Sequence, residues 1–129
     1  MAQAAVPNVD ADLLTRLKSQ VETRVAICEK WLPLWRALLR YRSESELTIR
    51  IKRIRAAMGA RLALVYGPEL SRLSGERRAQ LLVALNILTD FESWGRMRED
   101  YGLSIEAARD VWIDAIARML PPSDASPEH

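Results

Sequence analysis

The sequence contains little of the chemistry that enzymes and metal sites need. Its 129 residues include one cysteine, Cys28, and one histidine, His129, which is the last residue. Zinc sites usually need several such ligands, and nucleophilic catalysis needs a neighbouring histidine or equivalent base. A lone cysteine forms no internal disulfide, which favours a cytoplasmic location, and we interpret Cys28 as a small buried hydrophobe. We therefore predict no enzyme activity, no catalytic residue, no metal site and no cofactor.

Long apolar runs and strand patterns are also missing. No segment approaches the roughly 18 consecutive apolar residues of a membrane span, so we expect no membrane contact. No stretch alternates apolar and polar residues between turn signals, so we predict no strand. Hydrophobic residues nevertheless make up 49% of the chain, which is enough for a core. The sequence therefore predicts a single all-α domain.

Helix caps and breakers place this domain at residues 10–120. We expect tails at 1–9 and 121–129, and the second tail is predicted to be disordered because it lacks large apolar side chains. The first helix is expected to begin near Asp10 or Asp12, with Leu14 on its inner face. Pro33 either kinks this helix or starts a second one that ends at Arg42.

The remaining helices are expected to begin at serine caps. Ser43 has the spacing of a capping box with Glu46, and its helix is predicted to end at Gly67. Ser74 is expected to cap a helix that continues to about Ser93. Ser104 is expected to cap the last helix, from 105 to 120.

The last two helices are apolar around most of their circumference. Between Leu81 and Trp94 only a narrow arc near Asn86 and Asp90 is polar, whereas a surface helix needs an apolar arc of little more than about 100°. We therefore expect a homodimer in which these helices of both subunits form a four-helix bundle. The alternative is a monomer with one central buried helix. The candidate interface residues are Val83, Asn86, Ile87, Val111 and Ala115.

Charge is distributed unevenly along the chain. Basic residues predominate from Arg36 to Arg61, and acidic residues outnumber basic ones after Asn86. Such a basic segment is typical either of a face that binds polyanions or of an ordinary solvated helix face.

The segment from Trp94 to Ser104 carries a family resemblance. It reads Trp-Gly-Arg-Met-Arg-Glu-Asp-Tyr-Gly-Leu-Ser and lies between an apolar helix and an alanine-rich final helix. This order resembles the C-terminal domain of TetR-type transcriptional regulators, and the similarity of pattern extends over roughly Leu14 to Leu120. The resemblance implies a helical bundle that binds a small molecule and dimerises through its last two helices.

One part of the family pattern is missing from this sequence. TetR-type proteins begin with a small module whose helix-turn-helix enters the DNA major groove, and no segment here reads as one. We therefore expect DNA to be a partner only through a module absent from this chain.

A small-molecule site is suggested by the many large rings and two adaptable methionines of the sequence. Such side chains suit a small apolar or aromatic effector, although each of them could equally belong to a solid core. The candidate ligand-binding residues lie on the inward stripes of the helices that, by resemblance, enclose the pocket of the family. They are Trp35, Leu39, Met58, Leu85, Thr89 and Trp94.

Two functions follow from these expectations. The leading hypothesis is the small-molecule-sensing and dimerisation domain of a TetR-type transcriptional repressor that lacks its DNA-reading module. The alternative is a helical homodimeric interaction protein without a small-molecule site.

Overall fold

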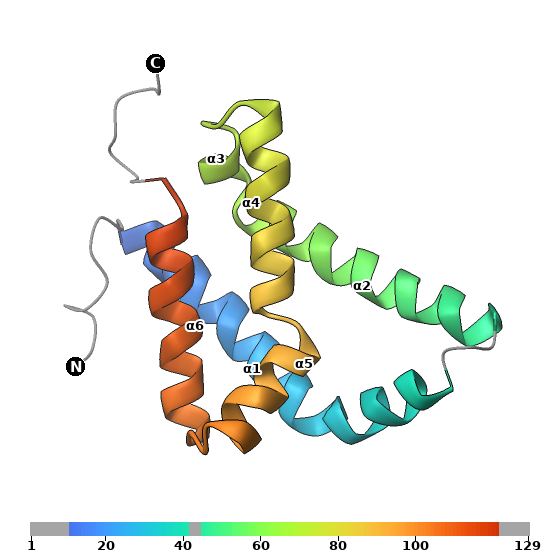
Figure 1. Cartoon of the computed structure of the whole chain (residues 1–129). Helices are drawn as coiled ribbons and strands as arrows, with labels where there is room; N and C mark the ends of the chain where they lie inside the picture. Colours follow the sequence, from blue (N-terminus) through green and yellow to red (C-terminus); the bar gives the residue numbers. More distant parts are fainter. Residues whose placement is uncertain (1–10, 42–44, 122–129) are drawn as a thin grey trace.

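A computed structural model describes residues 11–41 and 45–121 of the chain, and these residues form helices and no strand. The all-helical prediction is therefore confirmed for this part of the chain. The expected tail at 1–9, the expected tail at 121–129 except for Pro121, the cap at Ser43 and the end at Arg42 lie outside the described residues. The elements, drawn in Figure 1, are α1 (Ala11–Arg40), α2 (Ser45–Val65), α3 (Gly67–Leu70), α4 (Gly75–Leu88), α5 (Phe91–Gly95), the π-helix η2 (Arg96–Asp100) and α6 (Ile105–Met119).

Helix α1 continues through Pro33 instead of stopping there. A proline inside a helix removes one backbone hydrogen bond and bends the axis, and Figure 1 shows that α1 bends in its second half. The inner face of α1 starts at Leu13, which is fully buried, whereas the predicted Leu14 is half-buried. The buried apolar residues of α1 are Leu13, Leu17, Val21, Val25, Cys28, Leu32 and Trp35.

Serine side chains begin two of the helices, as predicted. The Oγ of Ser74 accepts a hydrogen bond from the backbone N–H of Arg77 at 3.2 Å, at the start of α4. The Oγ of Ser104 accepts one from the N–H of Ala107 at 3.0 Å, at the start of α6. Each bond satisfies a backbone donor that the first helical turn leaves free.

The predicted continuation of the Ser74 helix to Ser93 is wrong, because α4 ends at Leu88. The hydroxyl of Thr89 donates to the carbonyl of Leu85 at 2.8 Å, and the Asp90 carboxylate accepts from the N–H of Phe91 at 2.8 Å. These side chains compete with the helical ladder for backbone groups and start the separate helix α5. The π-helix η2 follows, and Gly102 then turns the chain with a positive φ of 65°.

The core is built on α1, which contacts α2, α5 and α6. Trp94 of α5 and Trp112 of α6 are fully buried, with ring centroids 4.9 Å apart. The indole N–H of Trp112 donates to the carbonyl of Leu88 at 2.9 Å, which joins α6 to the end of α4. Cys28 is fully buried in this core, and burial raises the pKa of its thiol to about 12. The interpretation of Cys28 as a buried hydrophobe is confirmed.

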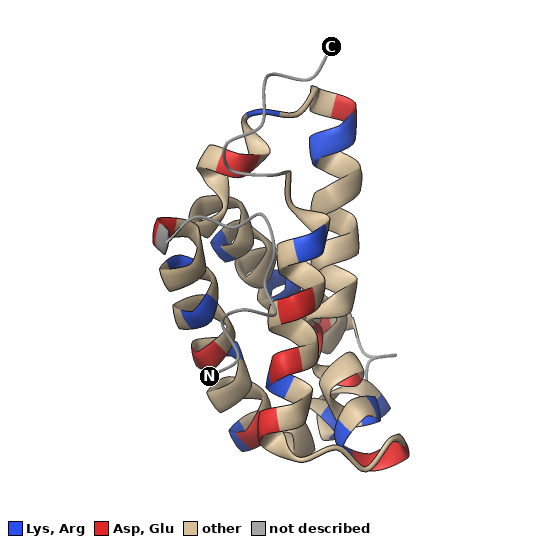
Figure 2. Cartoon of the chain, turned by 90° about the vertical axis from the view of Figure 1, so that its left-hand side faces the viewer, with Lys and Arg blue, Asp and Glu red and all other residues tan. Residues whose placement is uncertain are grey.

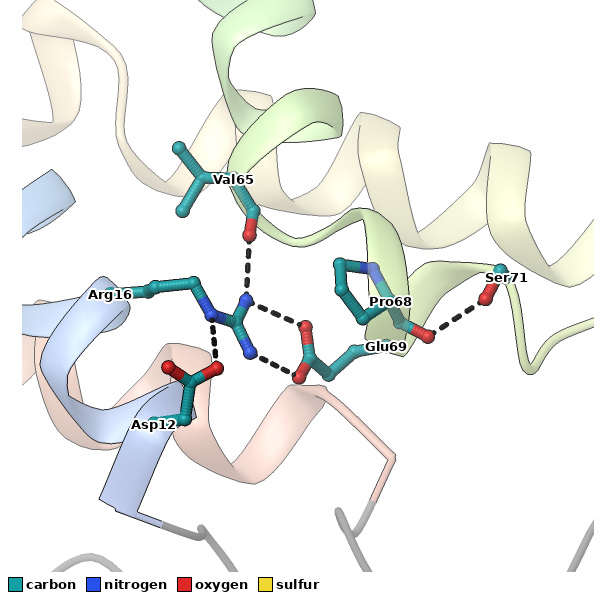
Figure 3. Close-up of polar contacts among 6 residues, drawn as sticks. All are labelled: Asp12, Arg16, Val65, Pro68, Glu69 and Ser71. Atoms are coloured by element: carbon teal, nitrogen blue, oxygen red, sulfur yellow. Dashed lines mark hydrogen bonds and ion pairs between the residues drawn. The ribbon is translucent and has the colours of Figure 1, made fainter.

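An ion-pair clamp ties the beginning of α1 to the junction of α2 and α3. Figure 3 shows the Arg16 guanidinium facing the buried Glu69 carboxylate, with hydrogen bonds of 2.7 and 3.1 Å. Arg16 also donates to the carbonyl of Val65 at 2.7 Å and to Asp12 at 3.1 Å. The clamp therefore connects residues about fifty positions apart and orients α2 against α1.

Candidate functional site

Several surface clefts lie around the middle of α2, and one of them separates α2 from α4. It has a volume of about 510 Å³ and is lined by Arg55, Ala56, Met58, Asn86, Ile87 and Asp90. At Gly59 the two helices are so close that a Cβ atom there would lie 3.1 Å from the Asn86 side chain. The residues of α2 that line this α2–α4 cleft come before Gly59, and those after α2 begin at Asn86. The cleft therefore lies on one side of the close contact between Gly59 and Asn86.

A charged cluster forms one wall of the α2–α4 cleft. Arg55 Nη2 lies 3.2 Å from Glu92 Oε2 and 3.8 Å from Asp90 Oδ2. Burial, together with the hydrogen bond and negative charge of Glu92, raises the pKa of Asp90 to about 6. Burial opposes ionisation of Glu92 as well, but the hydrogen bond from Asp90 and the charge of Arg55 outweigh it and lower the pKa of Glu92. The two carboxyl groups are therefore pushed in opposite directions, and Asp90 is the one whose pKa rises.

A second cleft, of about 390 Å³, lies between α1 and α2. Its lining residues are Gln20, Thr23, Arg24, Ile27, Ala57, Met58 and Arg61. The Arg24 side chain crosses the interior, and its Nη1 donates to the carbonyl of Thr89 at 2.8 Å and to the Thr89 hydroxyl at 3.0 Å. This α1–α2 cleft is therefore connected through one side chain to the point where α4 ends.

A smaller apolar cleft of about 160 Å³ lies beside the second half of α1. It is lined by Trp31, Leu34, Trp35, Leu38, Ile54 and Phe91. The rings of Trp35 and Phe91 stack with centroids 4.8 Å apart, and the Arg55 guanidinium lies 5.2 Å from the Trp35 ring. This stacking orders α5 against α1 at the edge of the charged cluster.

The structure places two of the six predicted ligand-binding residues in clefts and the other four in or against the core. Met58 lines the α2–α4 and α1–α2 clefts, and Trp35 lines the apolar cleft. Leu39 is partly buried against the core. The other three residues have no exposed surface and belong to the core, where the Trp94 indole donates to Glu29 at 2.7 Å. These three are Leu85, Thr89 and Trp94.

The polar residues of the clefts were missed by the sequence analysis. Arg24 and Gln20 are each only 4% exposed, and they interrupt the apolar stripe of α1 beside Val21 and Val25. A charged or amide side chain inside an apolar stripe is a signal that can be read from a sequence, because such groups are rarely buried without a partner. Asp90 carried a second signal, since aspartate is a common helix N-cap.

The predicted interface residues lie mostly on the outer faces of α4 and α6. Val83 and Ile87 are 59% and 65% exposed, and Val111 is 43% exposed. Ala115 is partly exposed on α6, whereas Asn86 lies against Gly59 of α2 and donates to the carbonyl of Leu82 at 2.8 Å. Helices α4 and α6 contact each other, so their exposed apolar side chains belong to neighbouring elements.

The basic segment from Arg36 to Arg61 is partly neutralised by acidic residues from the later helices. Arg36 forms a bidentate pair with Glu99 of η2 at 2.7 and 2.8 Å, and Arg55 pairs with Glu92. In the view of Figure 2, basic and acidic bands are interspersed over the helices. The interspersed pattern gives more support to an ordinary solvated face than to a polyanion-binding face.

Residues 11–41 and 45–121 contain neither a metal-ligand cluster nor a membrane-spanning helix. No group of three or more histidine, cysteine, aspartate or glutamate side chains there could hold a metal ion. None of the helices in this part of the chain combines the length and the apolar character that crossing a membrane requires. Comparisons of the chain with protein-family models, with curated proteins and with solved structures find no match.

Proposed function

We propose that this chain is the effector-binding and homodimerisation module of a transcriptional regulator of the TetR type that its sequence resembles. The observation that carries the proposal is the exposed apolar surface on the neighbouring helices α4 and α6. No DNA contact is assigned to any residue of the chain. DNA would be reached only through a module outside this sequence.

The dimer part of the proposal is supported by the exposure of branched apolar side chains. Val83 and Ile87 project from α4, and Val111 projects from α6, on the sides opposite the buried residues of each helix. Removal of such apolar surface from water is the main favourable contribution to most protein association. A two-fold axis buries each residue twice, so pairing α4 and α6 with their copies produces a four-helix bundle from both subunits.

The effector part of the proposal is supported by the position of the clefts. The α2–α4 cleft shares Ile87 with the outer face of α4, and the α1–α2 cleft contacts Arg24, which holds the end of α4 through Thr89. A ligand in either cleft would therefore act on the helix that carries the dimer surface. Such a ligand changes the subunit arrangement only if it binds one arrangement more tightly than the other.

Light scattering coupled to size exclusion tests the dimer. We expect the mass of a dimer for the native chain and the mass of a monomer for Val83→Glu and Val111→Glu, because each places a charge in the paired surface. Leu64→Glu is the matched control, since Leu64 is 74% exposed on α2, outside that surface. A native chain that remains monomeric at high concentration would refute the proposal.

A helical homodimer without a small-molecule site is the second candidate. It is favoured by the complete burial of Leu85, Thr89 and Trp94, which fill the interior that an enclosed effector pocket would occupy. A dimer that binds no small molecule in either cleft would support this candidate over the first.

A further inference from the structure

We propose that the α1–α2 cleft binds an organic carboxylate with an apolar body. This inference names the ligand class for the effector function proposed above and rests on that function. It is carried by a buried arginine that forms no ion pair with a described residue, by a second arginine in the cleft lining and by an apolar wall.

Arg24 is a buried cation that forms no ion pair with a described residue, although the charge of Asp90 acts on it from a longer distance. The residue is 4% exposed, and its guanidinium donates to the carbonyl and the hydroxyl of Thr89 and, at 3.4 Å, to the carbonyl of Met58. No carboxylate of the described residues forms an ion pair with it, although arginine remains charged in proteins. Uncharged oxygens offset only part of the cost of burying this positive charge, so a negative group that entered the cleft would be attracted to Arg24.

The other polar groups of the cleft are also suited to an anion. Gln20 is 4% exposed, and its side-chain oxygen accepts a hydrogen bond from the Tyr66 hydroxyl at 3.0 Å. Gln20 lies one helical turn before Arg24, and its amide nitrogen is of a type that can donate a hydrogen bond. Arg61 adds an exposed guanidinium, and the lining contains no aspartate or glutamate. The cleft thus presents two positive charges and no negative one.

The remaining wall of the cleft selects for an apolar body. Ile27, Ala57 and Met58 line it, and Ile27 is 39% exposed although it is a large apolar side chain. The volume of about 390 Å³ lies within the range of small-molecule sites. A carboxylate can accept two parallel hydrogen bonds from a guanidinium, while its hydrocarbon part covers Ile27 and Met58.

A carboxylate in this cleft would compete with Thr89 for the Arg24 guanidinium. Arg24 Nη1 holds both the carbonyl and the hydroxyl of Thr89, the residue at which α4 ends. Ligand binding therefore alters the contact between α1 and the end of α4. That contact is the physical route from the cleft to the proposed dimer surface.

Titration of the isotopically labelled full chain with sodium octanoate tests the ligand class. We expect saturable shifts of the backbone amide signals of residues 20–27 and 57–61. Octan-1-ol has the same chain without the charge, and acetate has the charge without the chain, so both should bind at least about tenfold more weakly. Equal binding of octanoate and octan-1-ol, equal binding of octanoate and acetate, or no saturation at millimolar octanoate would each overturn the proposal.

Substitutions in the cleft locate the anion. Arg61→Gln should weaken octanoate binding by about three- to tenfold, and Arg24→Gln by more than about tenfold. Arg53→Gln is the matched control, because Arg53 is exposed on α2 outside the cleft lining and should leave the affinity unchanged. If Arg24→Gln fails to fold, the comparison of Arg61→Gln with Arg53→Gln decides, and equal affinities for these two variants would contradict the site.

The mass of the native chain separates this inference from the function on which it rests. A dimer that does not bind octanoate would overturn the carboxylate site and leave the dimerisation module standing. A monomer that binds octanoate with the expected dependence on Arg61 would keep the site and overturn the dimer.

Discussion

Asp90 has two roles that place opposite demands on its charge. As the N-cap of α5, it accepts a hydrogen bond from the backbone N–H of Phe91, and a negative charge strengthens that bond. Its burial beside the Glu92 carboxylate favours the protonated form, and the pKa rises to about 6. Arg55 lies 3.8 Å away and compensates only in part.

Replacing Asp90 by asparagine should remove a dependence of stability on pH. Because the pKa of Asp90 is raised in the folded protein, the folded chain holds a proton that the unfolded chain has released. Its stabilising contribution is complete below the unfolded pKa of 3.8 and is lost as the pH rises through about 6. Between pH 4 and pH 7 the native protein should therefore lose about 1–2 kcal/mol relative to Asp90→Asn.

Urea unfolding of both proteins at intervals from pH 4 to pH 7.5 measures this difference. Asp90→Ser provides the matched comparison, because serine also caps helices and carries no charge. It should show the same relative trend as Asp90→Asn. A difference between native and variant proteins that stays constant with pH would show that Asp90 does not titrate in this range.

At the scale of elements, the junction of α1 with α2 and α3 depends on the Arg16–Glu69 clamp. Glu69→Ala should lower the free energy of unfolding by about 2–3 kcal/mol, because it removes a buried hydrogen-bonded charge and leaves Arg16 without its main partner. Asp12→Ala removes another partner of Arg16, but the Asp12 side chain is 83% exposed. Its loss should cost about 0.5 kcal/mol or less. Chemical denaturation compares the two variants, and equal losses would show that burial of Glu69 does not strengthen the clamp.

Local signals predicted the beginnings of the later helices better than their ends. Ser74 and Ser104 begin helices because a cap needs only one side chain and the next three residues. The end of α4 was missed, because the apolar pattern continues past Leu88 while the hydrogen bonds of Thr89 and Asp90 interrupt the backbone. The π-helix Arg96–Asp100 has no comparable signature in the sequence.

The candidate site was predictable only in part, for a related physical reason. Met58 and Trp35 were found because apolar inward residues can be read from helical spacing. The same reading placed Trp94 in a pocket, although whether a ring lines a pocket or fills a core depends on tertiary packing. The position of Arg24 in the apolar stripe of α1 could be read from the sequence, but its partner Thr89 could not, because Thr89 is sixty-five residues away along the chain.

For the whole molecule, dimerisation should couple stability to concentration. If the folded chain is a dimer and the unfolded chain a monomer, mass action favours the folded form as the protein becomes more concentrated. We expect the Tm to rise by about 3–5 °C for each tenfold increase in concentration. Differential scanning calorimetry of the native chain and of Val83→Glu measures this effect. The variant should show no such rise, and a native Tm that is independent of concentration would argue against the dimer.

The indole rings of Trp94 and Trp112 are a pair of chromophores buried in the core. Their rings lie 4.9 Å apart at an interplanar angle of 48°, and they join α5 to α6. Two chromophores held this closely in a fixed, chiral arrangement interact electronically, whereas Trp31 is 44% exposed on α1. The near-ultraviolet circular dichroism of the chain should therefore include a contribution from the contact between α5 and α6, beside that of the stacked pair Trp35 and Phe91. Loss of the near-ultraviolet signal of Trp94 and Trp112 would therefore indicate that α5 and α6 have separated in the core.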